Sequence, residues 1–281
     1  MKKLILRIIL VMIIFPLLYL LIFILVEPNF LALNILFISF TFIGSFELVN
    51  IFNKIGIYPF KYTSSILSIT IIVATYIEVY YLPEFKYFSY IWLALALGFI
   101  QIRSIFSINK NNFLRTLPVI SSTSFIIIYP GFFMSFLTRI LSFNNPKFIF
   151  LFYVSLVFSN EIMSYLFGSL FGKNTRLGLF ISPNKTLVGF IAGLLGSLGV
   201  SILFYYFLPD LFSKGLFFVM LFGGIIGLSS IIGDLFESTM KRSANLKDSG
   251  TIMLGRGGIM DTIDALLLSA PIFYLIYPFI A

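Results

Sequence analysis

Residues 187–208 read LVGFIAGLLGSLGVSILFYYFL, which is 22 consecutive residues without a charged side chain. A membrane-spanning helix needs about 20 predominantly apolar residues, because each residue advances about 1.5 Å through a hydrocarbon core about 30 Å thick. Within that core the backbone must satisfy its own hydrogen bonds, which a helix can do and an open strand cannot. The stretch therefore predicts a transmembrane helix.

Similar apolar stretches recur along the rest of the chain. None alternates between apolar and polar residues over about ten residues, as a transmembrane barrel strand would. The sequence therefore predicts an all-α integral membrane protein with about nine transmembrane helices. The expected spans are residues 4–26, 30–52, 64–82, 88–102, 117–137, 148–171, 187–208, 216–235 and 265–280.

The overall composition agrees with a membrane protein. Of the 281 residues, 59% are apolar and 11% are charged, whereas soluble domains have about 45–50% apolar and about 25% charged residues. The chain has no Cys and no His, which excludes disulfides, thiolate nucleophiles, Cys- or His-ligated metals and Ser–His–Asp catalysis. Any chemistry must use carboxylates, lysines, arginines, hydroxyls, backbone dipoles and hard cations such as Mg²⁺.

The basic residues predict an orientation in the membrane. The net charge of +8 is typical of basic cytoplasmic loops, so we expect no nucleic-acid partner. With a cytoplasmic amino terminus, 15 of the 19 basic residues lie on the inner side, and the outer loops hold only Lys86, Arg139, Lys147 and Lys214. This bias predicts that the amino terminus is inside. The first apolar stretch is longer than that of a signal peptide, so we expect it to be a retained helix.

Polar residues gather in two blocks of the C-terminal half, and the first is residues 160–186. Glu161 lies within an apolar span, where an ionised carboxylate costs about 2.5–3.5 kcal/mol. It therefore faces a polar cavity or partner, or it is hydrogen-bonded within the bundle. Gly168 and Gly172 are four residues apart, which is typical of close helix packing. Residues 182–186, SPNKT, precede a helix and form either a phosphate-binding turn or an ordinary interfacial loop.

The second block, residues 233–264, contains five of the eleven acids of the chain. Asp261 and Asp264 are three residues apart and share one face of a helix, and Asp234 and Glu237 repeat that spacing. Such acidic pairs can form an all-oxygen Mg²⁺ site, while the neighbouring lysines, arginines and glycines suit a polyphosphate. The alternative is a solvated cytoplasmic loop whose charges pair locally, for example Glu237 with Lys241.

These residues resemble the signature of the phosphatidate cytidylyltransferase family, also called CDP-diacylglycerol synthases. The family pattern is roughly S-x-x-K-R-x4-K-D-x-G-x3-P-G-H-G-G-x-x-D-R-x-D, preceded by G-D-L. It is similar to Gly233, Asp234, Leu235, Ser238, Lys241, Arg242, Lys247, Asp248, Gly250, Gly255, Gly257, Gly258, Asp261 and Asp264. An earlier family motif resembles Tyr165, Gly168, Phe171, Gly172, Lys173, Ser182, Pro183, Lys185 and Thr186. The recognisable part covers about residues 160–268, and the first five spans agree only in being hydrophobic.

The chain departs from the family pattern at four positions. Arg256 stands where the family usually has His, Thr262 where it has Arg, Leu254 where it has Pro, and Glu161 where Asp is common. The acids and the two K-R and K-D pairs remain, so the resemblance implies that the catalytic core is retained. Because Thr262 replaces the family's Arg, the core has one cation fewer than the family pattern.

The resemblance implies an enzyme of phospholipid biosynthesis. A phosphate oxygen of phosphatidate attacks the α-phosphorus of CTP, pyrophosphate leaves, and CDP-diacylglycerol forms. Because the nucleophile is already an anion, the reaction needs no strong general base, which agrees with a chain that lacks His and Cys. The enzyme must hold two polyanions in line and neutralise the charge that develops between them.

The resemblance also implies roles for individual residues. The metal ligands are expected to be Asp234, Asp261 and Asp264. The catalytic residues are expected to be Lys241, Lys247 and Asp248. The substrate-binding residues are expected to be Ser182, Lys185, Ser238, Arg242, Arg256, Gly257 and Gly258. The expected cofactor is Mg²⁺, with a monovalent cation such as K⁺ left open, and a homodimer is compatible with the family.

The sequence predicts two regions. Residues 1–140 form N-terminal transmembrane helices, and residues 141–281 form a C-terminal catalytic transmembrane region with cytoplasmic loops. We expect a multi-pass protein of the inner (cytoplasmic) cell membrane whose active site faces the cytoplasm. Two alternatives remain at this point, namely a related enzyme that acts on another lipid or polyprenyl phosphate, and a non-enzymatic multi-span transporter.

Arg256 is expected to contact the triphosphate of CTP, because a guanidinium between glycines can meet a phosphate with two parallel N–H groups. The substitution Arg256→Glu should then raise the KM for CTP at least tenfold, about 1.4 kcal/mol. Steady-state kinetics with CTP as the varied substrate measures this. An unchanged KM would mean that Arg256 faces water or lipid headgroups and would remove it from the site.

Overall fold

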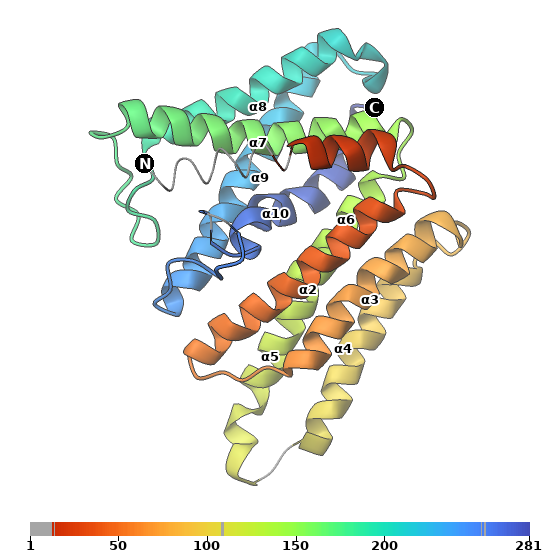
Figure 1. Cartoon of the computed structure of the whole chain (residues 1–281), viewed down its shortest axis with the longest axis vertical. Coiled ribbons are helices and arrows are strands. Elements are labelled where there is room, and N and C mark those ends of the chain that lie inside the picture. Colours follow the sequence, from red (N-terminus) through yellow and green to blue (C-terminus); the bar gives the residue numbers. More distant parts are fainter. Residues whose placement is uncertain (1–12, 14, 108–109, 254, 256) are drawn as a thin grey trace. The chain divides into compact units, whose positions relative to one another are not determined.

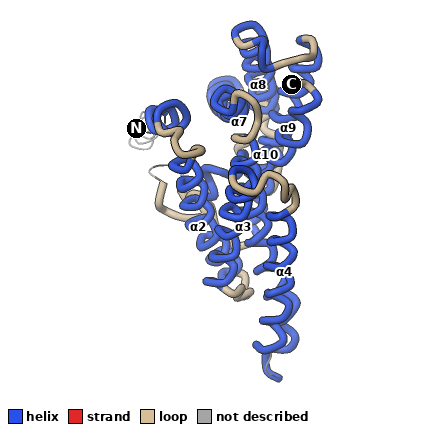
Figure 2. Tube along the Cα trace, turned by 90° about the vertical axis from the view of Figure 1, so that its right-hand side faces the viewer, coloured by secondary structure: helices blue, strands red, loops and turns tan. Residues whose placement is uncertain are grey.

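The computed structural model describes residues 13, 15–107, 110–253, 255 and 257–281. These residues form helices joined by loops, and the described part contains no strand (Figure 2). Eight of the helices are long and apolar enough to cross a membrane, which confirms the all-α membrane class. The remaining expected span, residues 4–26, falls partly outside the described residues. Within its described part, a shorter apolar helix covers Phe15–Ile24.

The chain packs as two compact units. Unit 1 comprises Met1–Ser142 and Ser243–Thr262, and unit 2 comprises Phe143–Arg242 and Ile263–Ala281. The segment that joins the last two helices therefore packs with the N-terminal helices rather than with its sequence neighbours. A packing unit differs from a functional region, so the predicted division into residues 1–140 and 141–281 stays a prediction.

Unit 1 is a bundle in which α2, α3 and α4 lie side by side and one long interrupted helix packs against them (Figure 1). Its elements are η1 (Leu20–Ile24), α2 (Leu31–Lys54), α3 (Lys61–Tyr80), α4 (Phe88–Ser107), η2 (Lys110–Arg115), α5 (Thr116–Ile126), η3 (Ile127–Phe132) and α6 (Phe133–Ile140). The interrupted helix runs from η2 to α6.

The interruption in that helix is caused by Pro130, which lies in the widened π-helical turn η3. Proline has no N–H to donate to the carbonyl of Ile126, four residues earlier. The hydroxyl of Ser68 on α3 lies 3.0 Å from that carbonyl oxygen and 2.7 Å from the carbonyl oxygen of Ser64, so the two oxygens share this donor. A side chain at Gly131 would come within 2.8 Å of the Ser68 backbone, so the glycine allows α3 to approach closely enough for this contact.

A buried ion pair also holds unit 1 together. Arg139 on α6 donates to Glu78 on α3 at 2.9 Å, and both side chains are 5% exposed. Glu78 also accepts from the backbone N–H of Ser89 at 2.6 Å, and the Arg139 guanidinium lies 4.6 Å from the centre of the Tyr90 ring. The placement of Arg139 in an outer loop is therefore wrong, because its charge is neutralised inside the bundle by Glu78.

Unit 2 is formed by the last four long helices. Its elements are α7 (Pro146–Phe171), α8 (Leu187–Phe207), η4 (Pro209–Leu211), α9 (Leu216–Ser243), α10 (Met260–Ile276, of which the first three residues belong to unit 1) and η5 (Tyr277–Phe279). Helices α7 and α8 lie side by side (Figure 1). A side chain at Gly193 of α8 would come within 2.9 Å of the Asn160 side chain, so the small residue permits tight packing. The Asn160 amide donates to Ser197 at 3.2 Å and to the carbonyl of Gly227 at 3.3 Å, which joins α7, α8 and α9.

Candidate active site

The residues singled out from the sequence fall into two groups, one in each unit. Unit 2 holds Ser182, Lys185, Asp234, Ser238, Lys241, Arg242 and Asp264, and unit 1 holds Lys247, Asp248, Gly257, Gly258 and Asp261. Arg256 and Leu254 lie outside the described residues. The predicted site thus consists of a helix-borne group and a loop-borne group.

Four carboxylates form the centre of the group in unit 2. Asp264 is buried in the first turns of α10 and accepts from the backbone N–H of Ala265 at 2.7 Å. The carboxylates of Asp234, Glu161 and Glu237 lie close enough to repel its negative charge. They come from α7 and α9, so three helices bring these acids together. We call this set of four the acidic cluster.

Gly233 is the reason why α9 can bring Asp234 beside α10. A side chain at this position would come within 2.6 Å of the carbonyl oxygen of Asp264 and 3.3 Å of the Cα of Ala265. Contacts this short do not occur between a Cβ and backbone atoms, so only glycine lets the two helices touch here. Gly233 therefore allows the two helices to pack closely, and the next residue, Asp234, contributes a carboxylate to the acidic cluster.

Two lysines oppose part of the charge of the acidic cluster. Lys185 pairs with Asp234 at 2.7 Å, and the two side chains are 24% and 42% exposed. Lys241 pairs with Glu237 one turn earlier on α9, and both side chains are buried. This confirms the local pairing of Glu237 with Lys241 that their spacing predicts, and it places Lys241 in the cluster as a buried cation.

The loop before α8, which carries Lys185, lies beside the end of α9 in unit 2. Thr186 caps α8 by accepting from the backbone N–H of Gly189 at 3.0 Å, which confirms that a helix begins directly after residues 182–186. The Arg242 side chain at the end of α9 donates to the carbonyl of Ile181 at 3.2 Å, so this cation lies beside Ser182. Ser238 is buried on α9.

In unit 1 the glycine-rich loop is held by two carboxylates. Asp261 accepts through Oδ2 from the N–H of Ser249 at 2.8 Å, the N–H of Gly258 at 2.7 Å and the hydroxyl of Ser249 at 2.9 Å. Glu47, on α2, accepts from the hydroxyl of Ser249 at the start of the same loop and from the backbone N–H groups of Ile259 and Met260 at its end. Gly257 has φ +115° and a side chain there would come within 3.0 Å of the Asp248 Cβ, so the turn requires glycine.

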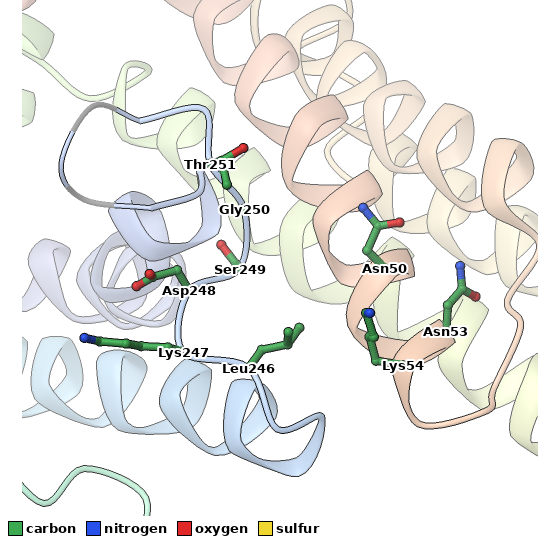
Figure 3. Close-up of a pocket in the computed structure, with 9 residues that line it drawn as sticks. All are labelled: Asn50, Asn53, Lys54, Leu246, Lys247, Asp248, Ser249, Gly250 and Thr251. Atoms are coloured by element: carbon green, nitrogen blue, oxygen red, sulfur yellow. The ribbon is translucent and has the colours of Figure 1, made fainter.

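A cavity of about 710 Å³ lies between this loop and the end of α2. Its lining residues are Asn50, Asn53, Lys54, Leu246, Lys247, Asp248, Ser249, Gly250 and Thr251. Figure 3 shows that the Lys247 and Asp248 side chains point away from α2, whereas Leu246 points toward it. Lys247 and Asp248 are exposed, so both are accessible to a ligand outside the cavity.

The structure adds contacts at three places where the sequence assigns no site role. Glu47 has no place in the family signature, yet it is buried and hydrogen-bonded to the loop. Glu161 and Glu237 join the acidic cluster; the position of Glu161 in an apolar span and the spacing of Glu237 from Asp234 were the available signals. Thr262, which replaces the family's Arg, donates its hydroxyl to the carbonyl of Gly258 at 3.2 Å.

The donor set of the acidic cluster suits a hard cation. In the described part of the chain no three acidic side chains are already arranged around a common point for a metal. Mg²⁺, however, commonly takes only one or two protein carboxylates and completes its shell with water and substrate phosphates. The four carboxyl groups beside two lysines supply the oxygen ligands that a divalent cation takes.

Comparison with known proteins gives one consistent family. The family model described as the cytidylyltransferase family matches residues 5–280. The phosphatidate cytidylyltransferase of Chlamydia pneumoniae is 32% identical over 248 residues, which are 83% of this chain and 78% of that protein. The corresponding Chlamydia trachomatis protein is 44% identical over 129 residues, so the match spans 45% of this chain and only 42% of that relative. The Staphylococcus haemolyticus protein is 34% identical over 179 residues, 63% of this chain and 65% of that protein.

The close approach at Gly233 can be tested by substitution. Gly233→Ala should lower the melting temperature in detergent, because overpacking of this kind costs about 1–3 kcal/mol. The matched control is Gly199→Ala on α8, where an added methyl meets nothing within 4 Å and helix propensity favours alanine by about 1 kcal/mol. Thermal unfolding of both variants measures the difference. Equal melting temperatures for the two variants would contradict the packing role of Gly233.

Proposed function

The chain belongs to the cytidylyltransferase family, and we propose that it transfers the cytidylyl group of CTP to phosphatidate, with CDP-diacylglycerol and pyrophosphate as products. The observation that carries this proposal is the acidic cluster with Lys185 and Lys241 set against it in unit 2. Acids that hold a divalent cation and lysines that meet phosphate are the parts that a phosphoryl-type transfer needs. The names of the relatives point to the same reaction.

The reaction breaks one bond and forms one bond. An oxygen of the phosphatidate phosphate attacks the α-phosphorus of CTP, and the bond from that phosphorus to the bridging oxygen of the β-phosphate breaks. The attacking group is already ionised, so no side chain has to remove a proton. The chain contributes position and charge, and each 1.36 kcal/mol of stabilisation of the transition state raises the rate tenfold.

The cationic residues would bind and orient the two polyanions. In unit 2, Lys185 and Arg242 flank the loop before α8, and we assign them with Ser182 and Ser238 to phosphate contacts. Lys241, held by Glu237, presents a charge whose direction is fixed by its partner. In unit 1, Lys247 and Asp248 are assigned to the same reaction because they are exposed on the loop that Asp261 holds.

Mg²⁺ would be held by Asp234 and Asp264 of unit 2, and the assignment of Asp261 as a metal ligand stays a prediction. When bound, the cation neutralises charge on the triphosphate and withdraws electrons from the phosphorus that is attacked. Lys185, which pairs with Asp234, would be free to turn to phosphate once the cation replaces it as the partner of that carboxylate. A monovalent cation beside Mg²⁺ and a homodimer stay predictions.

The decisive experiment is an assay of the purified full chain with labelled CTP, phosphatidate and Mg²⁺. We expect labelled CDP-diacylglycerol and an equal amount of pyrophosphate. Asp234→Asn should lower kcat/KM at least 100-fold, about 2.7 kcal/mol, because the cluster loses a charge that holds the cation. The matched control is Asp210→Asn, the same change at an exposed acid of unit 2 outside the cluster, which should keep wild-type rates.

Other outcomes of this assay would reject parts of the proposal. Product formed only when polyprenyl phosphate replaces phosphatidate would change the lipid substrate. No transfer to either lipid would reject the activity. Wild-type rates for Asp234→Asn at saturating Mg²⁺ would remove Asp234 from the metal site.

We also propose that this multi-pass protein lies in the inner cell membrane with the site on the cytoplasmic side, where CTP is available. The distribution of basic residues supports this side. The chain has no cysteine, so single cysteines can report sidedness. Cysteines at Asn184 and Thr251, both exposed, should resist an impermeant thiol reagent in intact cells, whereas a cysteine at exposed Lys214 should react. The opposite pattern of labelling would reverse the orientation.

A further inference from the structure

Glu47 is a buried carboxylate on α2, far in sequence from the family signature. It is 4% exposed. Its Oε1 accepts from the backbone N–H of Ile259 at 2.9 Å, and its Oε2 accepts from the N–H of Met260 at 2.9 Å and the hydroxyl of Ser249 at 2.8 Å. All of these residues belong to unit 1. One side chain therefore connects α2 to both ends of the glycine-rich loop.

These hydrogen bonds are what stabilises the buried charge of Glu47. In the described part of the chain no lysine or arginine forms an ion pair with it. A buried carboxylate without such a partner is costly unless hydrogen-bond donors surround it. Its donors are present only while Ser249, Ile259 and Met260 keep their positions, so the carboxylate and the loop conformation stabilise each other.

Two glycines of the loop leave the space that the Glu47 carboxylate fills. A side chain at Gly250 would come within 2.8 Å of the Glu47 Cδ, and a side chain at Gly258 would come within 2.6 Å of the same atom. Neither glycine has a positive φ, so backbone freedom does not explain them. The close approach of Glu47 does.

Glu47 also reaches Asp261 through Ser249. The Ser249 hydroxyl lies 2.8 Å from Glu47 Oε2 and 2.9 Å from Asp261 Oδ2. A hydroxyl has a single proton and donates it to one carboxylate at a time. The two acids therefore share one donor, and a change at Glu47 alters the surroundings of Asp261 without touching it.

We propose that Glu47 is a positioning residue of the site: it holds the loop that carries Lys247 and Asp248, and the start of α10 that carries Asp261, in the conformation that binds the phosphates of CTP. The inference rests on the proposed function. It places α2, which the signature does not include, in the machinery of the reaction. Asn50 and Lys54 follow Glu47 at helical spacing on α2 and line the cavity beside the same loop (Figure 3).

The test compares Glu47→Gln with wild type. Glutamine keeps the shape but replaces one acceptor oxygen by an NH₂ group, so it cannot accept from all three donors. We expect a folded protein whose KM for CTP rises at least tenfold while kcat changes less. The equilibrium affinity for CTP, measured by calorimetry without phosphatidate, should fall by the same factor.

The matched control is Glu78→Gln. Glu78 is as buried as Glu47, at 4% exposed, and lies in the same unit, but it pairs with Arg139 and does not contact the loop. This variant should lower the melting temperature and leave the KM for CTP unchanged. If Glu47→Gln behaves like Glu78→Gln, Glu47 serves only the fold and the inference is wrong.

A second variant decides the matter if Glu47→Gln does not fold. Ser249→Ala removes one donor and keeps the backbone bond to Asp261, so it should raise the KM for CTP about threefold or more; an unchanged KM overturns the inference. Failure of the proposed function is distinguishable, because wild-type protein would then bind no CTP, whereas failure of the inference leaves wild-type binding intact and equal in the variants.

Discussion

The structure depends on one constraint, which is that a polar group inside a bilayer must find its partner within the protein. Pro130 creates a carbonyl without its usual donor, and Ser68 lies against that oxygen. Arg139 carries a charge into the bundle, and Glu78 neutralises it. Asn160 joins three helices by its amide. In each case a helix is positioned by a polar contact, while its apolar residues decide only that it lies in the membrane.

The same constraint shapes both parts of the site. The acidic cluster of unit 2 places carboxyl groups close to one another, and their mutual repulsion disfavours this arrangement. Lys185 and Lys241 offset that repulsion by pairing with two of the four acids. In unit 1, Glu47 and Asp261 use backbone N–H groups of the loop instead of cations. The first arrangement has charge available for a ligand, and the second uses its donors to fix a conformation. The two groups of carboxylates thus differ in their partners, which are lysine side chains in unit 2 and backbone N–H groups in unit 1.

Much of the fold could be predicted from the sequence, because apolar stretches of this length have one stable form in a membrane. The pairing of Glu237 with Lys241 was also predictable, since four residues along a helix bring two side chains together. Arg139 was misplaced because a charge count treats every cation as a loop residue, and its partner Glu78 lies 61 positions away. Glu47 was missed for the same reason, because Ser249 is 202 positions distant. Contacts across the chain leave no trace in local spacing.

The carboxylate of Glu47 has a consequence for the selectivity of the loop. The start of a helix is a common binding site for phosphate, since its first N–H groups are unpaired and its dipole favours an anion. At α10 the amides of Ile259 and Met260 are already taken by an internal anion. A free phosphate could bind these two N–H groups only by displacing the Glu47 carboxylate. The chain therefore fills the start of this helix with its own carboxylate, which occupies the two N–H groups that a phosphate would otherwise use.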